Sequence, residues 1–263
     1  MKLGLIVPYR DRKEHLKIFI PHMEEYFKKH NINYHIYIIH QQDNYLFNRG
    51  TMSNIGFSIA ENDVDYVIIH DVDTLVQNKE NIYYFREFPC CLIYSGVGLG
   101  INKSSVYFGG VNCITKKHFK QINGFSNNFW GWGGEDGDFR RRIEQENIKW
   151  TRESKANHKL LPHSRENTGY KRFDEKNSIF LKGNINIHNI DKICNLGKQN
   201  KLNYHIDGYK QIDYKINSIE KITENSTMFN IKNNNVPRYD VNKPISEKFL
   251  NTLLKDKYKK TNI

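Results

Sequence analysis

The chain has 263 residues and a formal net charge of +11, and 13% of its residues are aromatic. This length suffices for one large α/β domain or two small ones with a substantial buried core. No apolar run approaches the roughly 20 residues that span a bilayer. The first residues lead into a strand-like run rather than a signal peptide. We therefore expect no membrane span in this chain and, for the chain as written, a cytoplasmic location; a Golgi-type location would be expected only if the chain were truncated.

The positive charge is spread along the chain, with a local excess of eight basic over three acidic residues in 232–263. No nucleic-acid-binding motif accompanies it, so we expect no nucleic-acid partner. The cysteines lack the Cys-x-x-Cys spacing of a metal site, and adjacent cysteines rarely pair with each other. We expect free thiols in a reducing compartment. The four cysteines are Cys90, Cys91, Cys113 and Cys194.

The first 70 residues alternate between strand-like and helix-like patterns. Short apolar runs are typical of buried parallel strands, and apolar residues at helical spacing lie between them. Pro21 is expected to kink or restart the first helix. The alternation predicts an α/β fold with a mixed, mainly parallel sheet flanked by helices. In chain order, we predict strands at 3–7, 34–39 and 66–70 and helices over 16–27 and from about 51 to 61.

In such sheets, ligands bind beyond the carboxyl ends of the strands. The pattern Asp-x-Asp occurs three times, at 63–65, 71–73 and 136–138, so the pattern alone is weak evidence. Only Asp71-Val72-Asp73 directly follows an apolar strand. Extended backbone would send Asp71 and Asp73 to the same side, where they could hold a divalent cation and, through it, a diphosphate.

Three arginines, Arg10, Arg12 and Arg49, each stand just past a predicted strand. The planar guanidinium suits phosphate because it donates two parallel hydrogen bonds. One such arginine would be ordinary surface. Three of them beside an Asp-x-Asp motif predict an anionic ligand chelated by a metal ion.

The segment GWGGEDGDF, residues 131–139, combines glycines, an aromatic ring and acids. Its glycines allow backbone conformations that a side chain would forbid, and they flank Trp132. Glu135 and Asp136 open a predicted helix, where the helix dipole favours acids. An acidic helix start after a turn is the simpler interpretation. A tryptophan between glycines and beside carboxylates favours a sugar-binding or catalytic loop.

The segments PYRDR, FNRG, DVD, YFGGV, INGFSNNFWGWGGED and HSR follow one another in this order. In this order and at these separations, they resemble the β-1,4-galactosyltransferase family, which adopts the nucleotide-diphospho-sugar (GT-A) fold. The resemblance runs from Leu3 to about Phe173 and resumes weakly over 207–231. It implies a catalytic domain over 1–231, with a probable insertion at 174–206 and a basic tail at 232–263.

The resemblance implies metal-dependent, inverting transfer of galactose from UDP-galactose to a hydroxyl of an acceptor sugar in a glycan or glycoconjugate, giving a β-linkage. Asp136 would be the general base, and Glu135 would position the sugars. Asp73 and His163 would hold Mn²⁺, which stabilises the departing UDP. Relatives supply a further ligand shortly before this histidine, where this chain has leucines, so His158 or water would substitute.

The resemblance also assigns contacts to each substrate. The expected UDP-sugar contacts are Pro8, Tyr9, Arg10, Arg12, Phe47, Arg49, Asp71, Val72, Tyr107, Gly110 and Trp132. The expected acceptor contacts are Gly134, Glu135, Asp136 and Phe173. Family members that use UDP-GalNAc carry a smaller residue at position 107, so Tyr107 favours galactose. Gly137 replaces an acid that helps hold the acceptor in relatives, which leaves GlcNAc, glucose and xylose open.

Three alternatives stand beside this hypothesis. A UDP-GalNAc or other hexosamine-transferring enzyme of the same fold would differ only in its donor. A catalytically weak sugar-binding protein is conceivable because the further metal ligand is missing. A basic nucleic-acid-binding module would bind with strong salt dependence.

Overall fold

The structure, a computed structural model, describes residues 1–93, 95–97, 107–131, 133–162 and 203–236. The strands are β1 (Lys2–Tyr9), β2 (Asn33–Gln41), β3 (Tyr66–His70), β4 (Thr74–Val76), β5 (Cys90–Cys91), β6 (Ser95–Val97), β7 (Val111–Thr115), β8 (Thr151–Arg152), β9 (Asn157–Leu160), β10 (Tyr214–Thr223) and β11 (Ser226–Asn233). The helices are α1 (Lys13–Lys29), α2 (Arg49–Ala60), α3 (Lys116–Gln121), α4 (Glu135–Gln145) and the 3₁₀ helices η2 (Tyr204–Ile206) and η3 (Tyr209–Gln211).

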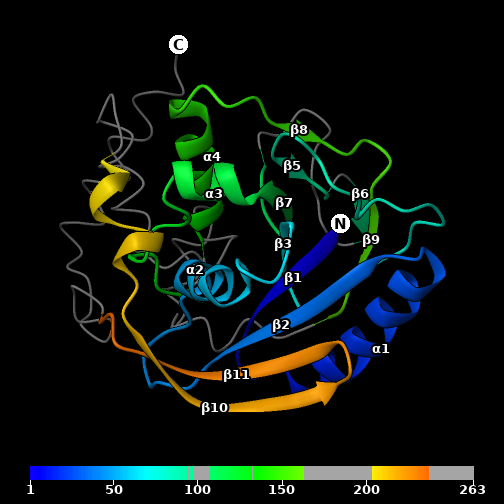
Figure 1. Cartoon of the computed structure of the whole chain (residues 1–263), viewed down its shortest axis with the longest axis horizontal. Coiled ribbons are helices and arrows are strands. Elements are labelled where there is room, and N and C mark those ends of the chain that lie inside the picture. Colours follow the sequence, from blue (N-terminus) through cyan, green and yellow to red (C-terminus); the bar gives the residue numbers. More distant parts are fainter. Residues whose placement is uncertain (94, 98–106, 132, 163–202, 237–263) are drawn as a thin grey trace, which may run out of the picture.

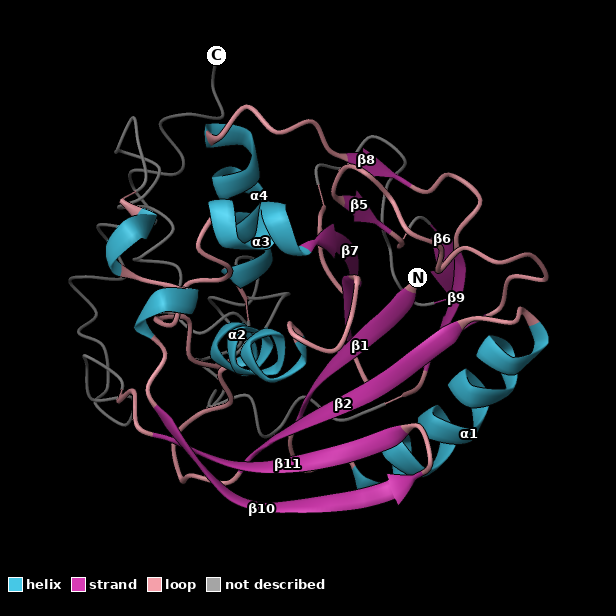
Figure 2. Cartoon of the chain, viewed as in Figure 1, coloured by secondary structure: helices cyan, strands magenta, loops and turns pink. Residues whose placement is uncertain are grey.

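An eight-stranded sheet in the order β10-β11-β2-β1-β3-β7-β5-β8 runs through the molecule (Figures 1 and 2). The pairs β1–β2, β1–β3, β2–β11 and β5–β8 are parallel, and the other three pairs are antiparallel. A smaller sheet has the order β4-β9-β6. The prediction of a mixed, mainly parallel sheet flanked by helices is confirmed. The strands predicted at 3–7 and 34–39 are longer at both ends, and the third is as predicted.

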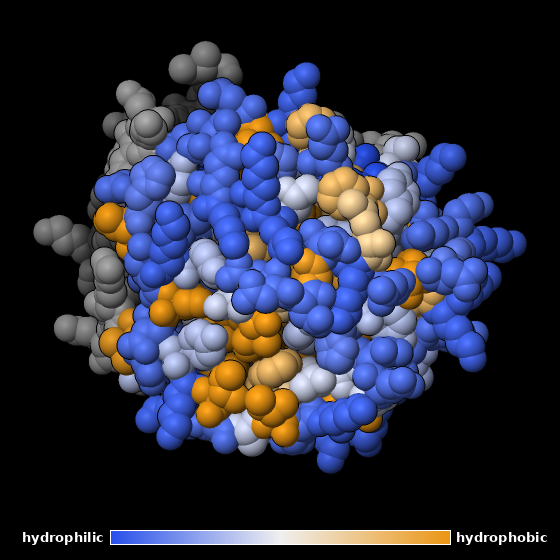
Figure 3. Space-filling view, in the orientation of Figure 1, coloured by the Kyte–Doolittle hydropathy of each residue, from blue (hydrophilic) through white to orange (hydrophobic). Residues whose placement is uncertain are grey.

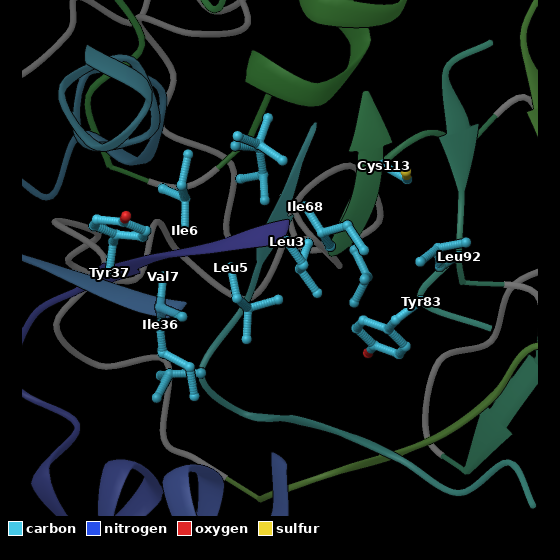
Figure 4. Close-up of a cluster of buried hydrophobic side chains, with 14 of the residues drawn as sticks. Leu3, Leu5, Ile6, Val7, Ile36, Tyr37, Ile68, Tyr83, Leu92 and Cys113 are labelled. Carbon is cyan, nitrogen blue, oxygen red and sulfur yellow. The ribbon is translucent and has the colours of Figure 1, made fainter. Parts of the chain in front are cut away.

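The hydrophobic core fills both faces of the central strands. In Figure 4, Leu5, Val7 and Ile36 point toward α1, whereas Ile6 and Tyr37 point toward α2. Successive strand residues face opposite sides of a sheet, so strands buried on both sides need continuous apolar runs. Those runs are what made these strands predictable from the sequence.

Helix α2 lies unusually close to the sheet. A Cβ placed on Gly56 would lie 2.4 Å from Ile6 Cγ2 and 2.9 Å from Ile39 Cγ1. The side chain of Asn48 accepts the backbone N–H of Thr51 at 2.9 Å and caps the helix. The backbone N–H of Asn48 also donates to Gln41 Oε1 at 2.8 Å, which ties the start of α2 to the carboxyl end of β2.

Helix α1 continues through Pro21, so the expected restart of the helix is wrong. Proline removes one hydrogen bond from a helix. Here its side chain is exposed, while the apolar face on both sides of it is packed in the core. The buried residues are Leu16, Phe19, Ile20, Met23, Tyr26 and Phe27. Their packing outweighs the lost hydrogen bond.

A buried polar network holds the segment between α3 and α4. Asn127 Oδ1 accepts from Asn54 Nδ2 of α2 at 3.0 Å. On its other side, the backbone N–H of Asn127 donates to Asp207 Oδ1 at 2.8 Å and its side-chain amide donates to the Gly208 carbonyl at 2.7 Å. The C-terminal 3₁₀ segment therefore fixes the chain that leads into residues 131–139.

The outer strand β10 leaves apolar side chains exposed. Ile216, Ile219 and Ile222 are 37%, 60% and 41% exposed. Figure 3 shows a mostly hydrophilic face with a hydrophobic patch over its lower part, where Figure 1 places β10 and β11. Across the described ranges, no helix combines the length and apolar character needed to cross a membrane.

The prediction of free thiols is confirmed for three cysteines. Cys90, Cys91 and Cys113 are buried and make no disulfide. Cys194 lies outside the described residues. Burial raises the pKa of Cys91 to about 11 and that of Cys113 to about 12, so both thiols stay protonated and unreactive at neutral pH.

Replacing Arg142 by Ala is expected to destabilise the fold by about 3–5 kcal/mol, because it leaves a buried carboxylate without its partner. Arg142 and Asp138 have side chains only 2% and 4% exposed and are 2.8 Å apart. The matched control is Arg140→Ala, whose partner Glu144 is exposed and whose loss should cost under about 1 kcal/mol. Urea unfolding measures both. Equal losses in the two variants would contradict the predicted difference.

Candidate active site

A buried arginine joins two carboxylates that are far apart in the sequence. Arg49, the first residue of α2, donates through Nε to Asp71 Oδ1 at 2.7 Å and through Nη1 to Asp136 Oδ1 at 2.9 Å. Their side chains are 10%, 34% and 22% exposed. Asp71 follows β3, and Asp136 lies in the first turn of α4. The structure thus brings three of the predicted segments together, FNRG with Arg49, DVD with Asp71 and GWGGEDGDF with Asp136.

The charges in this site are unbalanced. Burial disfavours the charge on Arg49, but the carboxylates of Asp71, Asp136 and Glu135 raise its pKa above the ordinary value. Burial raises the pKa of Asp136 well above the usual carboxyl range; Arg49 opposes that rise, and Glu135 and Asp71 add to it. Burial likewise raises the pKa of Glu135. One guanidinium faces three carboxylates, so added positive charge would be favoured here.

The Asp-x-Asp motif lies in a turn. The Asp71 carbonyl accepts the backbone N–H of Thr74 at 3.2 Å, and the Asp71 N–H donates to the Gly110 carbonyl at 3.0 Å. The extended backbone expected for 71–73 is therefore wrong, because these contacts bend the chain immediately after β3. The carbonyl of Asp73 in turn accepts the N–H of Leu161 at 2.7 Å.

Two glycines let Asp136 and Tyr107 approach the backbone immediately before β7. A Cβ on Gly109 would lie 2.1 Å from Asp136 Oδ2 and 2.6 Å from the Tyr107 hydroxyl. Both side chains therefore press against the same bare backbone. Gly110 has a φ of 74° and brings its carbonyl to the Asp71 N–H. Tyr107 thus lies beside the carboxylate site.

The glycines of the GWGG segment adopt the left-handed conformations that the sequence indicates. Gly131, Gly133 and Gly134 have φ values of 71°, 99° and 102°. Gly134 is the N-cap residue immediately before α4, whose first turn carries Glu135. The Gly131 N–H donates to the carbonyl of Phe47 at 2.8 Å. Trp132 itself lies outside the described residues, so its predicted role stays a prediction.

The remaining donor-contact candidates lie around the carboxyl end of β1. Tyr9 is buried against the His40 ring, and Arg12 precedes α1 without capping it through its side chain. Arg10 donates to the Tyr45 carbonyl and lines a pocket of about 570 Å³ that none of the site carboxylates borders. The pocket residues are Arg10, Asp11, His40, Gln41, Gln42, Asp43, Asn44 and Asn217. Pro8 lies in β1 beside them.

The predicted metal ligands are only partly described. Asp73 follows the buried Val72 in the turn, whereas His163 and the acceptor candidate Phe173 lie beyond the described ranges. His158, considered as a substitute ligand, is 1% exposed and packs in the core beside Tyr83. Within the described part of the chain, no three His, Cys, Asp or Glu side chains form a group that could hold a metal ion.

The other two Asp-x-Asp pairs have structural partners. Asp63 binds Lys2 Nζ at 2.6 Å and accepts from the Tyr37 hydroxyl at 2.7 Å. Asp138 pairs with Arg142. The Asp-x-Asp motif alone was therefore not informative, because Asp136 of the third pair meets Arg49 while Asp138 of the same pair binds Arg142.

Sequence reasoning missed three residues that shape this site. Gly109 was overlooked although its neighbour was selected, and the doubled glycine of YFGGV was the available signal. Gln41 accepts the Asn48 N–H at 2.8 Å and so sets the start of α2. Asp207 holds the chain before residues 131–139 from far along the sequence, and no local pattern indicates that contact.

Comparison with known proteins agrees with this architecture. Residues 1–86 match the profile described as the N-terminal region of glycosyl transferase group 7, and residues 101–164 match the N-terminal domain of galactosyltransferase. A solved complex of a Drosophila β-1,4-galactosyltransferase 7 mutant with manganese, UDP-Gal and xylobiose superposes with a TM-score of 0.70 at 27% identity, covering 92% of this chain and 96% of that one.

Human β-1,4-galactosyltransferase 4 is 31% identical over 224 residues, which are 83% of this chain and 60% of that protein. Human β-1,4-galactosyltransferase 7 is 37% identical over 172 residues, 65% of this chain and 50% of that protein. The chain thus spans about half to three fifths of the length of these relatives. The fold is that of a GT-A glycosyltransferase. Within that class, the chain belongs to the β-1,4-galactosyltransferase family.

Replacing Gly109 by Ala is expected to destabilise the protein by about 1–3 kcal/mol, because the added methyl group overlaps the Asp136 carboxylate. Gly137→Ala is the matched control, since no atom of the part of the chain that the structure describes lies within 4 Å of a Cβ placed there. Because alanine favours a helix more than glycine does, Gly137→Ala should stabilise the protein by up to about 1 kcal/mol. Thermal and urea unfolding measure whether each variant has a lower or a higher free energy of unfolding than the native protein. Unchanged stability in Gly109→Ala would contradict the close approach.

Proposed function

We propose that this chain is a metal-dependent inverting glycosyltransferase that moves galactose from UDP-galactose to a hydroxyl of an acceptor sugar, forming a β-linkage. The observation that carries the proposal is the joining of Asp71 and Asp136 through Arg49. It puts the predicted donor-binding turn and the predicted general base at one site. The likeness to a galactosyltransferase whose structure contains manganese, UDP-Gal and xylobiose supports it.

The residues around Asp73 fit a manganese ion by their chemistry and charge. Carboxylate oxygens suit Mn²⁺, and the neighbouring site has more carboxylates than cations. The carbonyl of Asp73 accepts the backbone N–H of Leu161. Leu161 lies two residues before His163 in the sequence, so the chain leads from a contact with Asp73 to the other predicted metal ligand. Bound there, the metal ion would neutralise charge on the departing diphosphate.

Asp136 is proposed as the general base. Arg49 holds its Oδ1, and Oδ2 lies against Gly109. The carboxylate would take the proton of the acceptor hydroxyl while the hydroxyl oxygen bonds to C1 of galactose and the bond from C1 to UDP breaks. Attack from the face opposite UDP converts the α-linked donor into a β-linked product. Glu135, one residue before, is proposed to position the sugars.

The donor and acceptor assignments rest on two positions. The Tyr107 hydroxyl lies beside Gly109 and Gly110, and its bulk supports galactose over an N-acetylated sugar. Among the described residues, no atom lies within 4 Å of a Cβ placed on Gly137, where relatives have an acid, so GlcNAc, glucose and xylose all stay open as acceptors. We also propose a catalytic domain over 1–231, with an insertion at 174–206, and a basic tail over 232–263. The last strand, β11, ends at Asn233, two residues beyond the proposed end of the domain.

The direct test is incubation with UDP-Gal or UDP-GalNAc, Mn²⁺ and a panel of GlcNAc, glucose and xylose acceptors, with the product linkage determined by NMR. We expect a β-linked galactoside. Asp136→Asn should lower kcat by about 10²–10⁴-fold, the usual contribution of a general base, while the variant still binds UDP. Near-normal turnover in this variant would refute the base assignment.

The metal assignment is tested by two substitutions in similar motifs. Asp73→Asn should weaken UDP binding in the presence of Mn²⁺ and reduce the response of activity to added Mn²⁺. Asp63→Asn, in the Asp-x-Asp pair that binds Lys2, should leave both unchanged and cost only stability. Full activity of the native enzyme in EDTA would contradict the assignment.

The pH profile should reflect the raised pKa of Asp136. A base acts only when deprotonated, so kcat/KM should fall with decreasing pH at a higher pH than for an ordinary carboxylate of pKa about 4. The charge on Glu135 contributes to that rise. Glu135→Gln should therefore move the acid limb of its residual kcat/KM to lower pH. A shift to higher pH would contradict this electrostatic account.

A further inference from the structure

A chain of buried polar side chains lies behind the turn that carries Asp73. His70, Tyr83 and His158 are 0%, 0% and 1% exposed. Figure 4 shows the Tyr83 ring inside the hydrophobic core, near Ile68 of β3. These groups come from three separate segments of the chain, and none has a place in the chemistry proposed above.

The hydrogen bonds run from the core to the backbone of the turn. His158 Nε2 lies 3.3 Å from the Tyr83 hydroxyl, which lies 2.7 Å from His70 Nε2. His70 Nδ1 lies 2.9 Å from the carbonyl of Asp71. That carbonyl is the one that closes the turn by accepting the Thr74 N–H.

The direction of every bond follows from this carbonyl. A carbonyl only accepts, so His70 Nδ1 must carry the proton, and in the neutral ring Nε2 must then accept. The Tyr83 hydroxyl donates to that nitrogen and accepts from the Nε2–H of His158. His158 Nδ1 is left without a proton, and it has no hydrogen-bond partner among the described residues.

The neutral state that this pattern needs is favoured by burial. All three side chains are almost completely buried, and burial disfavours a charge on any of them. All three groups are therefore neutral at physiological pH. Because each can bond in only one way, the chain has a single hydrogen-bonding arrangement.

We propose that His70, held in its Nδ1–H tautomer by Tyr83 and His158, is a positioning residue that fixes the Asp71–Thr74 turn and thereby the direction of the Asp73 carboxylate. Two donors bind the Asp71 carbonyl, so this peptide unit cannot rotate without breaking both bonds. The inference rests on the proposed function, because it concerns the residue assigned to the metal ion.

The test measures Mn²⁺ affinity in the presence of UDP, with free Mn²⁺ followed by electron paramagnetic resonance. His70→Phe keeps an aromatic ring and removes both hydrogen bonds of His70. It should weaken Mn²⁺ binding by about five- to tenfold, the effect of losing the one bond that reaches the turn, the bond to the Asp71 carbonyl. His70→Asn should restore most of the affinity, because its amide can donate near the position of Nδ1. Tyr83→Phe should give an intermediate loss.

A matched control separates positioning from stability. The Tyr26 hydroxyl donates to the Glu80 carbonyl at 2.6 Å, and its ring lies 5.5 Å from that of Tyr83, but it is not bonded to His70. Tyr26→Phe should lower the melting temperature without changing Mn²⁺ affinity. If His70→Phe also lowers only the melting temperature, His70 is merely structural and the proposal is wrong.

The tautomers are read directly by ¹H–¹⁵N NMR of the histidine rings, without any ligand. We expect His70 to be protonated at Nδ1 and His158 at Nε2 at neutral pH. His70 protonated at Nε2 would overturn the proposal. This measurement does not depend on the proposed function, whereas a native protein that binds no Mn²⁺ in the presence of UDP would refute that function and leave the tautomer result standing.

Discussion

The site depends on one buried guanidinium. Desolvating a charge is costly, and a buried cation is tolerated only when carboxylates satisfy it. Arg49 meets that condition with Asp71 and Asp136, and its Nη2 also approaches the Gly110 carbonyl at 3.5 Å. Three other segments of the chain are thereby tied to this one side chain of α2. Three carboxylates, those of Asp71, Glu135 and Asp136, face this one guanidinium. The site therefore holds Arg49 in place and also favours the binding of a further cation.

Much of this arrangement could be predicted because it follows from general rules of α/β sheets. Apolar runs indicated the central strands, and their carboxyl ends indicated where Arg49 and Asp71 would meet. The glycines around residues 131–134 indicated left-handed backbone, which the structure has. These predictions depend only on local pattern and on the usual placement of ligands at strand ends.

The rest depends on contacts between distant residues. The turn at Asp71 is closed by the Thr74 N–H, and Gly110, from a distant segment, binds the Asp71 N–H; a strand pattern alone gives no sign of the Gly110 contact. Helix α1 continues through Pro21 because core packing outweighs one missing bond. Gly109 is needed because Asp136, on another element, presses against it. In each case the deciding partner lies elsewhere in the chain, so single-sequence patterns could not show it.

The parallel pairing of β11 with β2 has a consequence for how the protein is made. Residues 226–231 of β11 bind residues 36–41 of β2, and Asp207 binds the backbone at Asn127. A ribosome releases every proposed catalytic side chain well before it releases these late segments. The nascent chain therefore holds a finished set of chemical groups on an incomplete scaffold, with one edge of β2 open to other strands. Contacts this far apart in sequence form slowly, and unpaired strand edges favour aggregation, so the growing chain is exposed to that risk during this interval.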